Sequence, residues 1–324
     1  MKTLWKLLPA SMLILATLPL TGITADSDYT KATLPVSAYS HPESHTLFSS
    51  SDEAVAAFVF ALRKEDQKLV GHILGRSAIP YVYSKDKSVS RMSVERFLNA
   101  YDEKSSLRYK DDTSAELLVG EQEWPLPFPL IKTGAQWHFD AVAGVEEWKQ
   151  RRIGGNEIAA IQISLAYADA QREYVLRDRN QDGLLEYAQR FDSTSGQHDG
   201  LYWPVAEGEE LSPMGEAFAY AHQEAGNKTV TRLAKSYHGY YFKILTRQGS
   251  SAPGGAFDYM TRSRLIGGFA LIAYPEQYAV TGIKSFIINH QGIVYSKDLG
   301  VRTSQLVRKI EVYNPDTSWS KESD

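Results

Sequence analysis

The sequence predicts an α+β protein of two domains, each with helices packed on a small antiparallel sheet. In the first half, two stretches with helical spacing of apolar residues are followed by short strand-like runs that end near residue 148. In the second half, a long helix-like stretch is followed by another group of strand-like runs. Helices and strands that are grouped along the chain indicate an α+β fold. The length of 324 residues fits one large domain or two ordinary ones.

The first domain is expected over residues 46–148 and opens with a helix over residues 52–69. Ser50 and Glu53 have the spacing of a capping box at its start. Apolar residues then recur at helical spacing: Val55, Phe58, Val59 and Leu62. A second helix is expected over residues 93–102, with one apolar face: Val94, Phe97, Leu98 and Tyr101.

Short strands should complete this domain. Residues 115–119 are apolar, and residues 124–131 alternate proline with apolar side chains. Because proline cannot donate to a strand ladder, residues 124–131 are expected to form an edge strand. A turn at residues 132–135 then leads to a returning strand at residues 137–140.

The second domain is expected over residues 149–319 and opens with a long helix. Gly154 and Gly155 should break any earlier helix, and Asn156 is a suitable cap for a helix that runs to about Arg177. Its inward side chains are expected to be Ile158, Ile161, Leu165 and Ala168. After loops that extend to about residue 235, strands are expected over residues 237–245, 267–274, 284–289 and 292–296. His290 and Gln291 would join the last two strands in a tight hairpin.

Residues 1–25 read as a cleavable secretory signal. Lys2 and Lys6 precede an apolar run over residues 7–20, and Ala25 supplies a small residue before the cut. The alternative is an uncleaved N-terminal anchor. Residues 26–45 are polar and aperiodic and read as a disordered lead-in. Later apolar runs are too short to span a bilayer, so we expect a periplasmic or secreted protein without a membrane span.

Composition excludes several classes of function. The chain has no cysteine, which excludes disulfides, catalytic thiols and thiolate metal sites. The formal charge of −4 comes without a basic block, so nucleic acid is not an expected partner. The remaining partners for an exported protein are another envelope protein or a glycan.

Residues 178–189 resemble a calcium-binding loop of the EF-hand type. Oxygen-bearing side chains stand at positions one, three, five and nine of that loop: Asp178, Asn180, Asp182 and Glu186. Gly183 occupies position six, but Gln189 replaces the glutamate expected at position twelve. The loop therefore predicts a structural calcium site or, alternatively, a plain polar turn that Gly183 ends.

Motifs of catalysis are not evident. The chain has no Gly-x-Ser-x-Gly elbow, no phosphate loop and no pair of histidines with the spacing of a zinc helix. Carboxylates are plentiful, but the spacing does not select a glycosidase pair. One candidate surface for a ligand or partner combines a carboxylate with aromatic residues: Asp199, Tyr202, Trp203, Tyr240 and Tyr241. These aromatics could stack on sugars or could simply belong to the core.

Two hypotheses of function follow. The first is a non-enzymatic interaction or structural module of the cell envelope, which calcium could stabilise. The alternative is an envelope glycan or peptidoglycan hydrolase that uses paired carboxylates.

The order of several unusual strings resembles a family of bacterial exported proteins known as domain of unknown function 2950. The strings are Asn156-Glu157, Ala170-Gln171-Arg172-Glu173-Tyr174, Asp199-Gly200-Leu201-Tyr202-Trp203-Pro204, His238-Gly239-Tyr240-Tyr241, Ala252-Pro253-Gly254-Gly255-Ala256 and Lys297-Asp298-Leu299-Gly300. The resemblance covers about residues 45–319. It implies an envelope protein without an established activity, so it assigns no catalytic residues.

The second half is also similar to the globular part of type II pseudopilins. The similarity lies in the expected long helix, the loops after it, and the strand-like segments near residues 239–240, 269–275 and 285–289. The prepilin processing site and the long apolar N-terminal helix of those proteins are missing. The resemblance therefore implies a helix packed on a sheet rather than assembly into a pilus.

Overall fold

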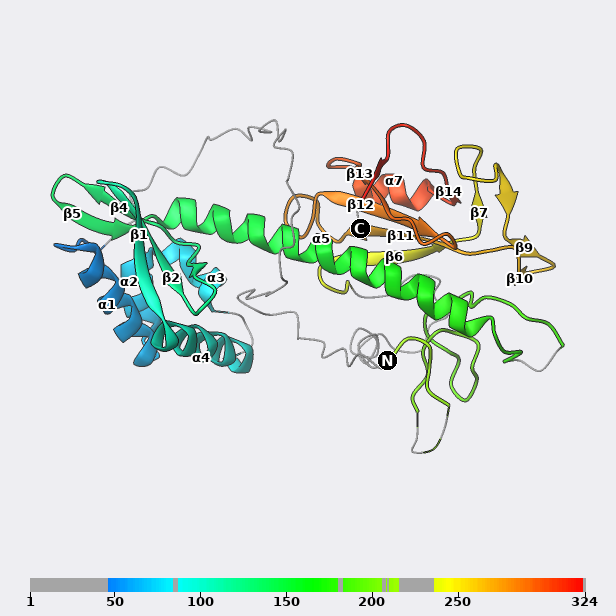
Figure 1. Cartoon of the computed structure of the whole chain (residues 1–324), viewed down its shortest axis with the longest axis horizontal. Coiled ribbons are helices and arrows are strands. Elements are labelled where there is room, and N and C mark those ends of the chain that lie inside the picture. The colour runs from blue at the N-terminus through cyan, green and yellow to red at the C-terminus, as the bar shows by residue number, and fades with distance from the viewer. Residues whose placement is uncertain are drawn as a thin grey trace. The chain divides into compact units, whose positions relative to one another are not determined.

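A computed structural model describes residues 46–83, 87–179, 183–205, 208, 210–215 and 236–322. The described residues form two compact units, which divide between Arg151 and Arg152. Each unit contains helices and small, mainly antiparallel sheets, so the predicted α+β class is confirmed (Figure 1). The expected signal peptide (residues 1–25) and lead-in (residues 26–45) lie outside the described residues.

The first unit has helices on one antiparallel sheet. Its helices are α1 (Ser51–Arg63), α2 (Gln67–Leu74), α3 (Ile79–Val82) and α4 (Lys87–Glu103), with a 3-10 turn at Arg76–Ala78. Its strands are β1 (Ser105–Asp111), β2 (Ser114–Val119), β3 (Trp124–Pro125), β4 (Leu130–Thr133) and β5 (Gln136–Phe139). The strand order is β1-β2-β4-β5, and β3 pairs with β2. Phe58 of α1 lies between Phe97 and Phe139 in the core, with ring centroids 5.7 and 5.5 Å away.

The single helix expected over residues 52–69 is wrong. Helix α1 ends at Arg63, and Glu65 adopts a left-handed conformation with φ of 53°. Asp66 then caps α2 because its carboxylate accepts a hydrogen bond from the Leu69 N–H at 3.0 Å. Residues 63–68 are all polar or charged and include neither glycine nor proline, so no helix-breaking residue marks this break in the sequence.

The cap of α1 is confirmed in part. The Ser50 hydroxyl accepts a hydrogen bond from the Glu53 N–H at 3.1 Å. The Glu53 carboxylate accepts from the N–H of Ser49 at 2.9 Å, one residue before the partner that a capping box would give it.

The continuous strand expected over residues 124–131 is also wrong. Only β3 and β4 pair with the sheet, and the buried side chains of Leu126 and Phe128 lie in the connection between them. The expected strands at 115–119 and 137–140 correspond to β2 and β5. Strand β1 was not predicted, because its residues are almost all polar.

Helix α5 (Ala141–Tyr174) is longer than predicted and starts earlier. The Asp140 carboxylate caps it by accepting from the Ala143 N–H at 2.9 Å. The expected break at Gly154 and Gly155 is wrong, since the helix continues through both glycines and through the division between the units.

The predicted inward face of α5 is wrong in part. Ala168 is buried, but Ile158 and Leu165 are 50% and 41% exposed. The buried face instead carries polar and aromatic residues among small ones: Ala160, Ser164, Tyr167, Ala168 and Gln171. Ile161 is half-buried and packs against the core, so the predicted face overlaps the buried one. Hydrophobic spacing left out Ser164 and Gln171 because buried, hydrogen-bonded polar residues do not contribute to it.

The second unit has an antiparallel sheet with the order β15-β13-β12-β11-β6. These strands are β6 (Tyr240–Leu245), β11 (Ala270–Pro275), β12 (Lys284–Asn289), β13 (Tyr295–Asp298) and β15 (Ser320–Lys321). Shorter strands are β7 (Arg247–Gln248), β8 (Phe257–Asp258), β9 (Met260–Thr261), β10 (Arg264–Leu265) and β14 (Val312–Tyr313), and helix α7 spans Thr303–Lys309. The sequence predicted β6, β11, β12 and β13 but not the shorter elements.

The expected two-residue hairpin at His290 and Gln291 is wrong. Ile287 pairs with Tyr295, so the connection between β12 and β13 is longer. His290 and Gln291 are nevertheless the central residues of a turn, which the Gly292 N–H closes onto the Asn289 carbonyl at 2.9 Å.

Polar side chains of α5 fasten the helix to the start of β12. One Glu157 oxygen accepts hydrogen bonds from the N–H groups of Ile283 and Lys284, both at 2.9 Å. The Asn156 amide donates to the Thr281 carbonyl at 2.8 Å.

In the part of the chain that the structure describes, no helix combines the length and apolar character needed to cross a bilayer.

Candidate functional site

The loops that follow α5, described over residues 175–179, 183–205, 208 and 210–215, contain most of the sequence-predicted site residues. Gln171 of α5 is fully buried and anchors them. Its amide donates to the Ala188 carbonyl and accepts from the Ala188 N–H, both at 2.8 Å. This reciprocal pairing imitates a strand ladder and holds residue 188 against the helix.

The guanidinium of Arg179 braces the same loops. Its side chain is 4% exposed and lies over the rings of Tyr174 and Trp203, 5.0 and 5.1 Å from their centroids. It donates to the Glu210 carboxylate at 2.6 Å. Arg177, which is mostly exposed, lies 3.0 Å from the same carboxylate. One buried cation therefore joins the end of α5 to a loop more than thirty residues further along.

Glu210 is held in its ionised form by these arginines. Burial opposes ionisation, but the hydrogen bond from Arg179 and the charges of Arg179 and Arg177 outweigh it, so the pKa of Glu210 is lowered. A carboxyl with a lowered pKa is a poor proton donor near neutral pH. Glu210 is thus suited to holding the loops rather than to acid catalysis.

The start of the expected calcium loop closes on itself. The Asp178 carboxylate accepts from the Gly183 N–H at 2.7 Å, and Gly183 has a φ of 85°. These are positions one and six of the loop pattern, and only glycine adopts such a conformation readily. Asn180 and Asp182 lie outside the described residues.

Two later positions of the loop contact the β9–β10 hairpin. Glu186 lies 3.5 Å from the guanidinium of Arg264. The Gln189 amide donates to the Ser263 carbonyl at 3.0 Å. Among the described residues, no group of three acidic or histidine side chains is arranged to hold a metal ion.

Asp199 and Trp203, expected on a ligand surface, make internal contacts. Asp199 accepts from the Thr194 N–H at 2.6 Å and lies 3.2 Å from Arg190. Trp203 is 3% exposed, and its ring stacks on His198 with centroids 4.2 Å apart. Trp203 is therefore a core residue without a free ring face.

The tyrosines of that expected surface are divided between core and surface. Tyr240 is fully buried, and its hydroxyl donates to the Lys284 carbonyl at 2.8 Å. Tyr202 and Tyr241 are half-buried, and Tyr241 packs on Tyr274 with centroids 5.6 Å apart. With Trp203 and Tyr240 in the core, this set does not supply a platform of four ring faces for a sugar.

An exposed apolar patch lies where the loops meet the β9–β10 hairpin. Tyr187 forms an isolated antiparallel bridge with Leu265, which brings the loop beside the β9–β10 hairpin. The Phe257 ring covers Gly267, since a Cβ added there would lie 2.6 Å from it. We name this set the hairpin patch, and its members are each 39–53% exposed: Leu184, Leu185, Phe257 and Ile266.

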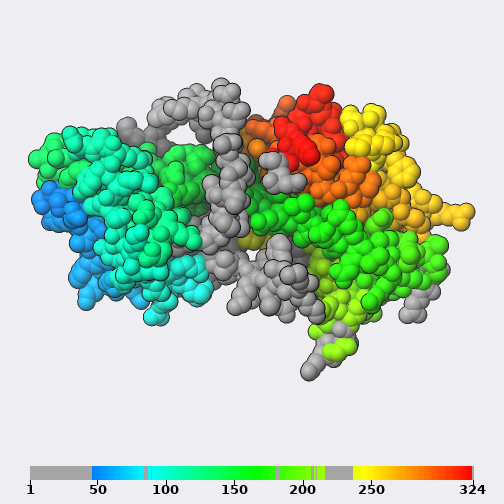
Figure 2. Space-filling model, viewed as in Figure 1, coloured from blue at the N-terminus to red at the C-terminus, as the bar shows by residue number. Residues whose placement is uncertain are grey.

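The hairpin itself projects from the second unit (Figures 1 and 2). Its turn residues Arg262 and Ser263 have φ of 49° and 64°. Such turns match the twist of paired strands but normally use Asn or Gly at these positions. The sequence therefore gave no hairpin signal here, although the structure makes one.

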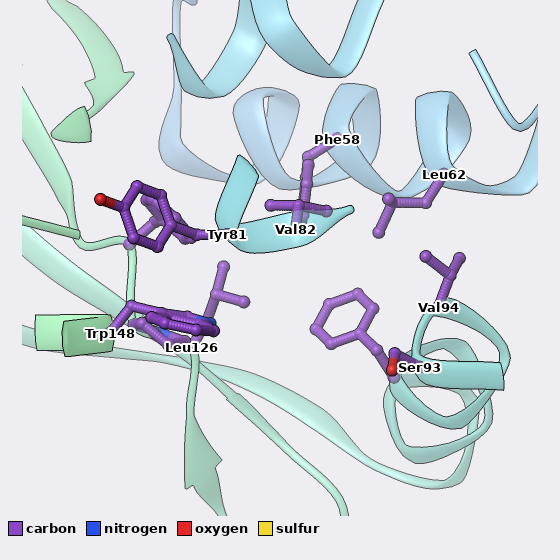
Figure 3. A pocket seen from close by; sticks show the side chains of 11 residues that line it. Phe58, Leu62, Tyr81, Val82, Ser93, Val94, Leu126 and Trp148 are labelled. Carbon is purple, nitrogen blue, oxygen red and sulfur yellow. The ribbon is translucent and has the colours of Figure 1, made fainter. Parts of the chain in front are cut away.

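A separate hollow lies in the first unit between α1, α3, α4 and residues 126–128. It encloses about 390 Å³ with its open mouth included. Figure 3 shows Tyr81 and Trp148 on one side and Ser93 and Val94 on the other. The Tyr81 and Trp148 rings meet edge to face at 5.1 Å. The lining is almost wholly apolar and lacks the converging polar groups of a catalytic pocket.

Sequence reasoning missed Gln171, Arg179 and Glu210. Arg179 belongs to the segment of the proposed calcium loop, but its side chain contacts Trp203 and Glu210, which are distant in sequence and which no local spacing marks. Gln171 stands in a helix, where a buried amide has no periodic signature. The shared string that contains Gln171 was the one signal available.

A family model described as "Protein of unknown function (DUF2950)" matches residues 45–322. No curated protein and no solved structure matches the chain. Within the matched region, Glu157 and Gln171 make hydrogen bonds that fasten the second unit together, and Trp203 is buried in its core. Because the match covers most of its length, the chain belongs to the DUF2950 family.

Proposed function

We propose that this chain is an exported cell-envelope protein that binds another envelope protein and is not an enzyme. Export rests on residues 1–25, whose charge, apolar run and terminal Ala25 are those of a secretory signal. Cell fractionation followed by N-terminal sequencing tests this part. A mature chain that begins at residue 26 in the periplasm or medium is expected, and a chain that retains Met1 in the cytoplasm would contradict it.

The observation that supports a binding role is that the carboxylates of the loops make contacts within the protein. Each described carboxylate of the sequence-predicted site contacts a neighbouring group. Asp178 accepts a hydrogen bond from the Gly183 N–H, and Asp199 accepts one from the Thr194 N–H. Glu186 forms an ion pair with Arg264. Glu210 is likewise held by Arg179. Carboxylates engaged in this way support the loops, which favours a rigid surface over an acid-base centre.

The hairpin patch is the surface that we assign to the partner. Its apolar side chains are exposed on a scaffold that Gln171 and Arg179 hold in place. Exposed apolar patches commonly mark protein–protein contacts, and a rigid patch loses little conformational entropy on binding.

The test is affinity capture from native envelope with a paired variant. Leu184→Ser together with Leu185→Ser should abolish recovery of a partner that the wild type captures reproducibly. Val301→Ser is the matched control, because Val301 is 84% exposed and lies outside the patch. Equal recovery by all three proteins would reject the patch as the binding surface.

A structural calcium ion is a second proposal, favoured by one specific contact. The hydrogen bond from the Gly183 N–H to the Asp178 carboxylate brings together positions one and six of the loop, and glycine at position six makes the sharp turn that a calcium loop contains. Glu186 forms an ion pair with Arg264, so in this proposal the other calcium ligands come from the rest of the loop rather than from Glu186.

The alternative function is hydrolysis of envelope glycan or peptidoglycan. It requires two carboxylates with different protonation states in one cleft. Incubation of the purified protein with peptidoglycan, followed by detection of released fragments, decides it. Release that is lost in Glu186→Gln or Asp199→Asn would favour the hydrolase over the binding role.

The pseudopilin-like architecture of the second unit remains a proposal. The long helix α5 followed by the antiparallel strands β6, β11, β12 and β13 supports it. An experimental structure of the protein tests it by superposition on the globular part of a type II pseudopilin.

A further inference from the structure

Strand β1 of the first unit is an open sheet edge. It spans Ser105–Asp111 at one end of the strand order, and only β2 pairs with it. All of its residues except Leu107 are exposed. Leu107 and Tyr109 lie on the face toward the core, where Leu107 packs against the core and the Tyr109 ring meets Trp137 at 6.0 Å, whereas the outer edge of the strand is open. Open edges of this length invite another strand to pair with them.

The register with β2 decides which backbone groups point outward. The Gly120 N–H donates to the Lys104 carbonyl at 2.8 Å, which makes this the first hydrogen-bonded pair of the ladder. Bonded and non-bonded pairs alternate in antiparallel sheets, so Ser106 and Arg108 bond to Leu118 and Glu116. The residues between them direct their N–H and C=O groups away from β2: Ser105, Leu107 and Tyr109.

These outward groups have no backbone partner within the described residues. The opposite side of β2 gives an independent check of the assignment. Leu117, which faces Leu107, uses its carbonyl to accept from the Leu126 N–H at 2.7 Å, on the side away from β1. Leu107 therefore stands at a non-bonded position toward β2.

The charges that usually protect an open edge are directed inward here. Arg108 and Lys110 both reach the Glu116 carboxylate on the neighbouring strand, at 2.6 and 2.5 Å. Lysine and arginine on an edge normally repel a second strand. In this protein one carboxylate neutralises part of that charge and holds both side chains over the sheet.

We propose that two copies of this chain associate by pairing their β1 strands antiparallel, with the two-fold axis at Leu107. In this register Leu107 faces Leu107 of the second copy, and Ser105 faces its Tyr109. All three outward residues then form bonded pairs with two N–H···O bonds each. Ser106 lies opposite Arg108 of the second copy. Lys104 lies opposite Lys110 of the second copy, but each of these lysines is paired with a glutamate of its own chain, Glu123 and Glu116 respectively.

Other registers satisfy fewer of these conditions. An axis at Arg108 places two guanidiniums directly opposite each other, which is destabilising. An axis at Ser106 leaves Tyr109 beyond the end of the partner strand. The self-complementary register about Leu107 is the reason to assign a second copy, rather than an unrelated peptide, to this edge. A single strand pair buries little surface, so the association should be weak and dependent on concentration.

The test uses the full protein and its lack of cysteine. Leu107→Cys introduces a single thiol that would meet its own copy across the axis, where bonded pairs have Cα atoms about 5.5 Å apart and disulfides form within roughly 4.4–6.8 Å. Asp112→Cys is the matched control, because Asp112 is exposed beyond the end of β1. Under mild oxidation the Leu107→Cys protein should form covalent dimers at least about tenfold faster than the control, since pairing raises the effective thiol concentration.

Sedimentation of the wild type over a range of concentrations completes the test. A reversible monomer–dimer equilibrium is expected. Leu107→Lys and Leu107→Glu should each be monomeric, and an equimolar mixture of the two should dimerise again, which also shows that both variants fold. A protein that stays monomeric at every concentration would overturn the proposal, as would a dimer in which Leu107→Cys and Asp112→Cys cross-link at equal rates.

Discussion

The guanidinium of Arg179 is almost entirely withdrawn from solvent and depends on three neighbours. Tyr174 and Trp203 cover its faces, and Glu210 accepts its hydrogen bond. A buried cation is costly unless it is paired, so the contacts of Arg179 are expected to contribute to the stability of the loops together with those of Gln171.

Replacing Arg179 should therefore destabilise the protein more than replacing its exposed neighbour. Arg179→Met is expected to lower the free energy of unfolding by about 2 kcal/mol, less than for a fully buried pair because Glu210 is 35% exposed. Arg177→Met removes a mostly exposed arginine from the same carboxylate and should cost at most about 0.5–1 kcal/mol. Urea unfolding of both variants measures the difference, and equal losses would contradict the role given to Arg179.

Glu116 makes an acid-sensitive contribution to stability. Burial tends to raise its pKa, but the hydrogen bonds from Lys110 and Arg108 and their charges outweigh burial, so its folded-state pKa is lowered. A lowered pKa stabilises the folded state above the unfolded-state value of about 4.3, and that stability is lost as pH falls through the folded-state pKa.

The Glu116→Gln variant should lose less stability than the wild type between about pH 5 and pH 3, because it lacks this carboxyl. Unfolding free energies measured by urea at several pH values supply the comparison. Arg108→Gln with Lys110→Gln keeps the carboxyl but removes both donors, so it should show the same flatter dependence. A variant curve parallel to the wild-type curve would show that Glu116 is not a source of the acid sensitivity.

At the scale of the elements, two of the three glycines of helix α5, Gly144 and Gly154, lie in contrasting surroundings. A Cβ added at Gly154 would have no atom within 4 Å, whereas one added at Gly144 would overlap the ring of Phe128. Gly154→Ala should stabilise the protein by about 0.5–1 kcal/mol through helix propensity. Gly144→Ala should destabilise it by about 1–3 kcal/mol through overpacking. Thermal unfolding of the two variants tests this, and a loss of stability in Gly154→Ala would indicate that the helix needs a flexible residue there.

Helix α5 also shows which elements sequence patterns can predict. Strands β2 and β12 were found because apolar runs bounded by turn residues are a strong local signal. The glycine pair at 154–155 suggested a helix break, yet tertiary contacts such as Glu157 with the start of β12 hold the helix through it. Strand β1 was missed because an exposed edge strand has no apolar alternation to reveal it.

The same limit applies to the candidate site at the scale of the whole molecule. The turn from Asp178 to Gly183 could be foreseen, because its residues are neighbours in sequence. The contacts of Arg179 and Gln171 could not, since their partners lie in later loops and meet them only in the folded chain. Trp203 and Tyr240 were expected on a ligand surface but are buried in the core, which the sequence alone did not reveal.

The proposed calcium ion would act on the stability of the entire second unit. At a free calcium concentration of about 100 Kd, binding adds about 2.7 kcal/mol, and each kcal/mol corresponds to about 2–4 °C in Tm for a domain of this size. EDTA should therefore lower Tm by roughly 5–10 °C. Asp178→Asn should unfold near the lower temperature with or without EDTA. Identical wild-type curves in calcium and in EDTA would exclude a structural ion.

The most direct test of the binding role is site-specific photo-crosslinking in intact cells. A photoreactive amino acid at Leu185, in the hairpin patch, should yield one reproducible cross-linked envelope protein. The same probe at Val301, which is 84% exposed elsewhere in the second unit, should yield none of that product. Cross-linking at Leu185 that matches the pattern at Val301 would contradict the account of this protein as a binding module.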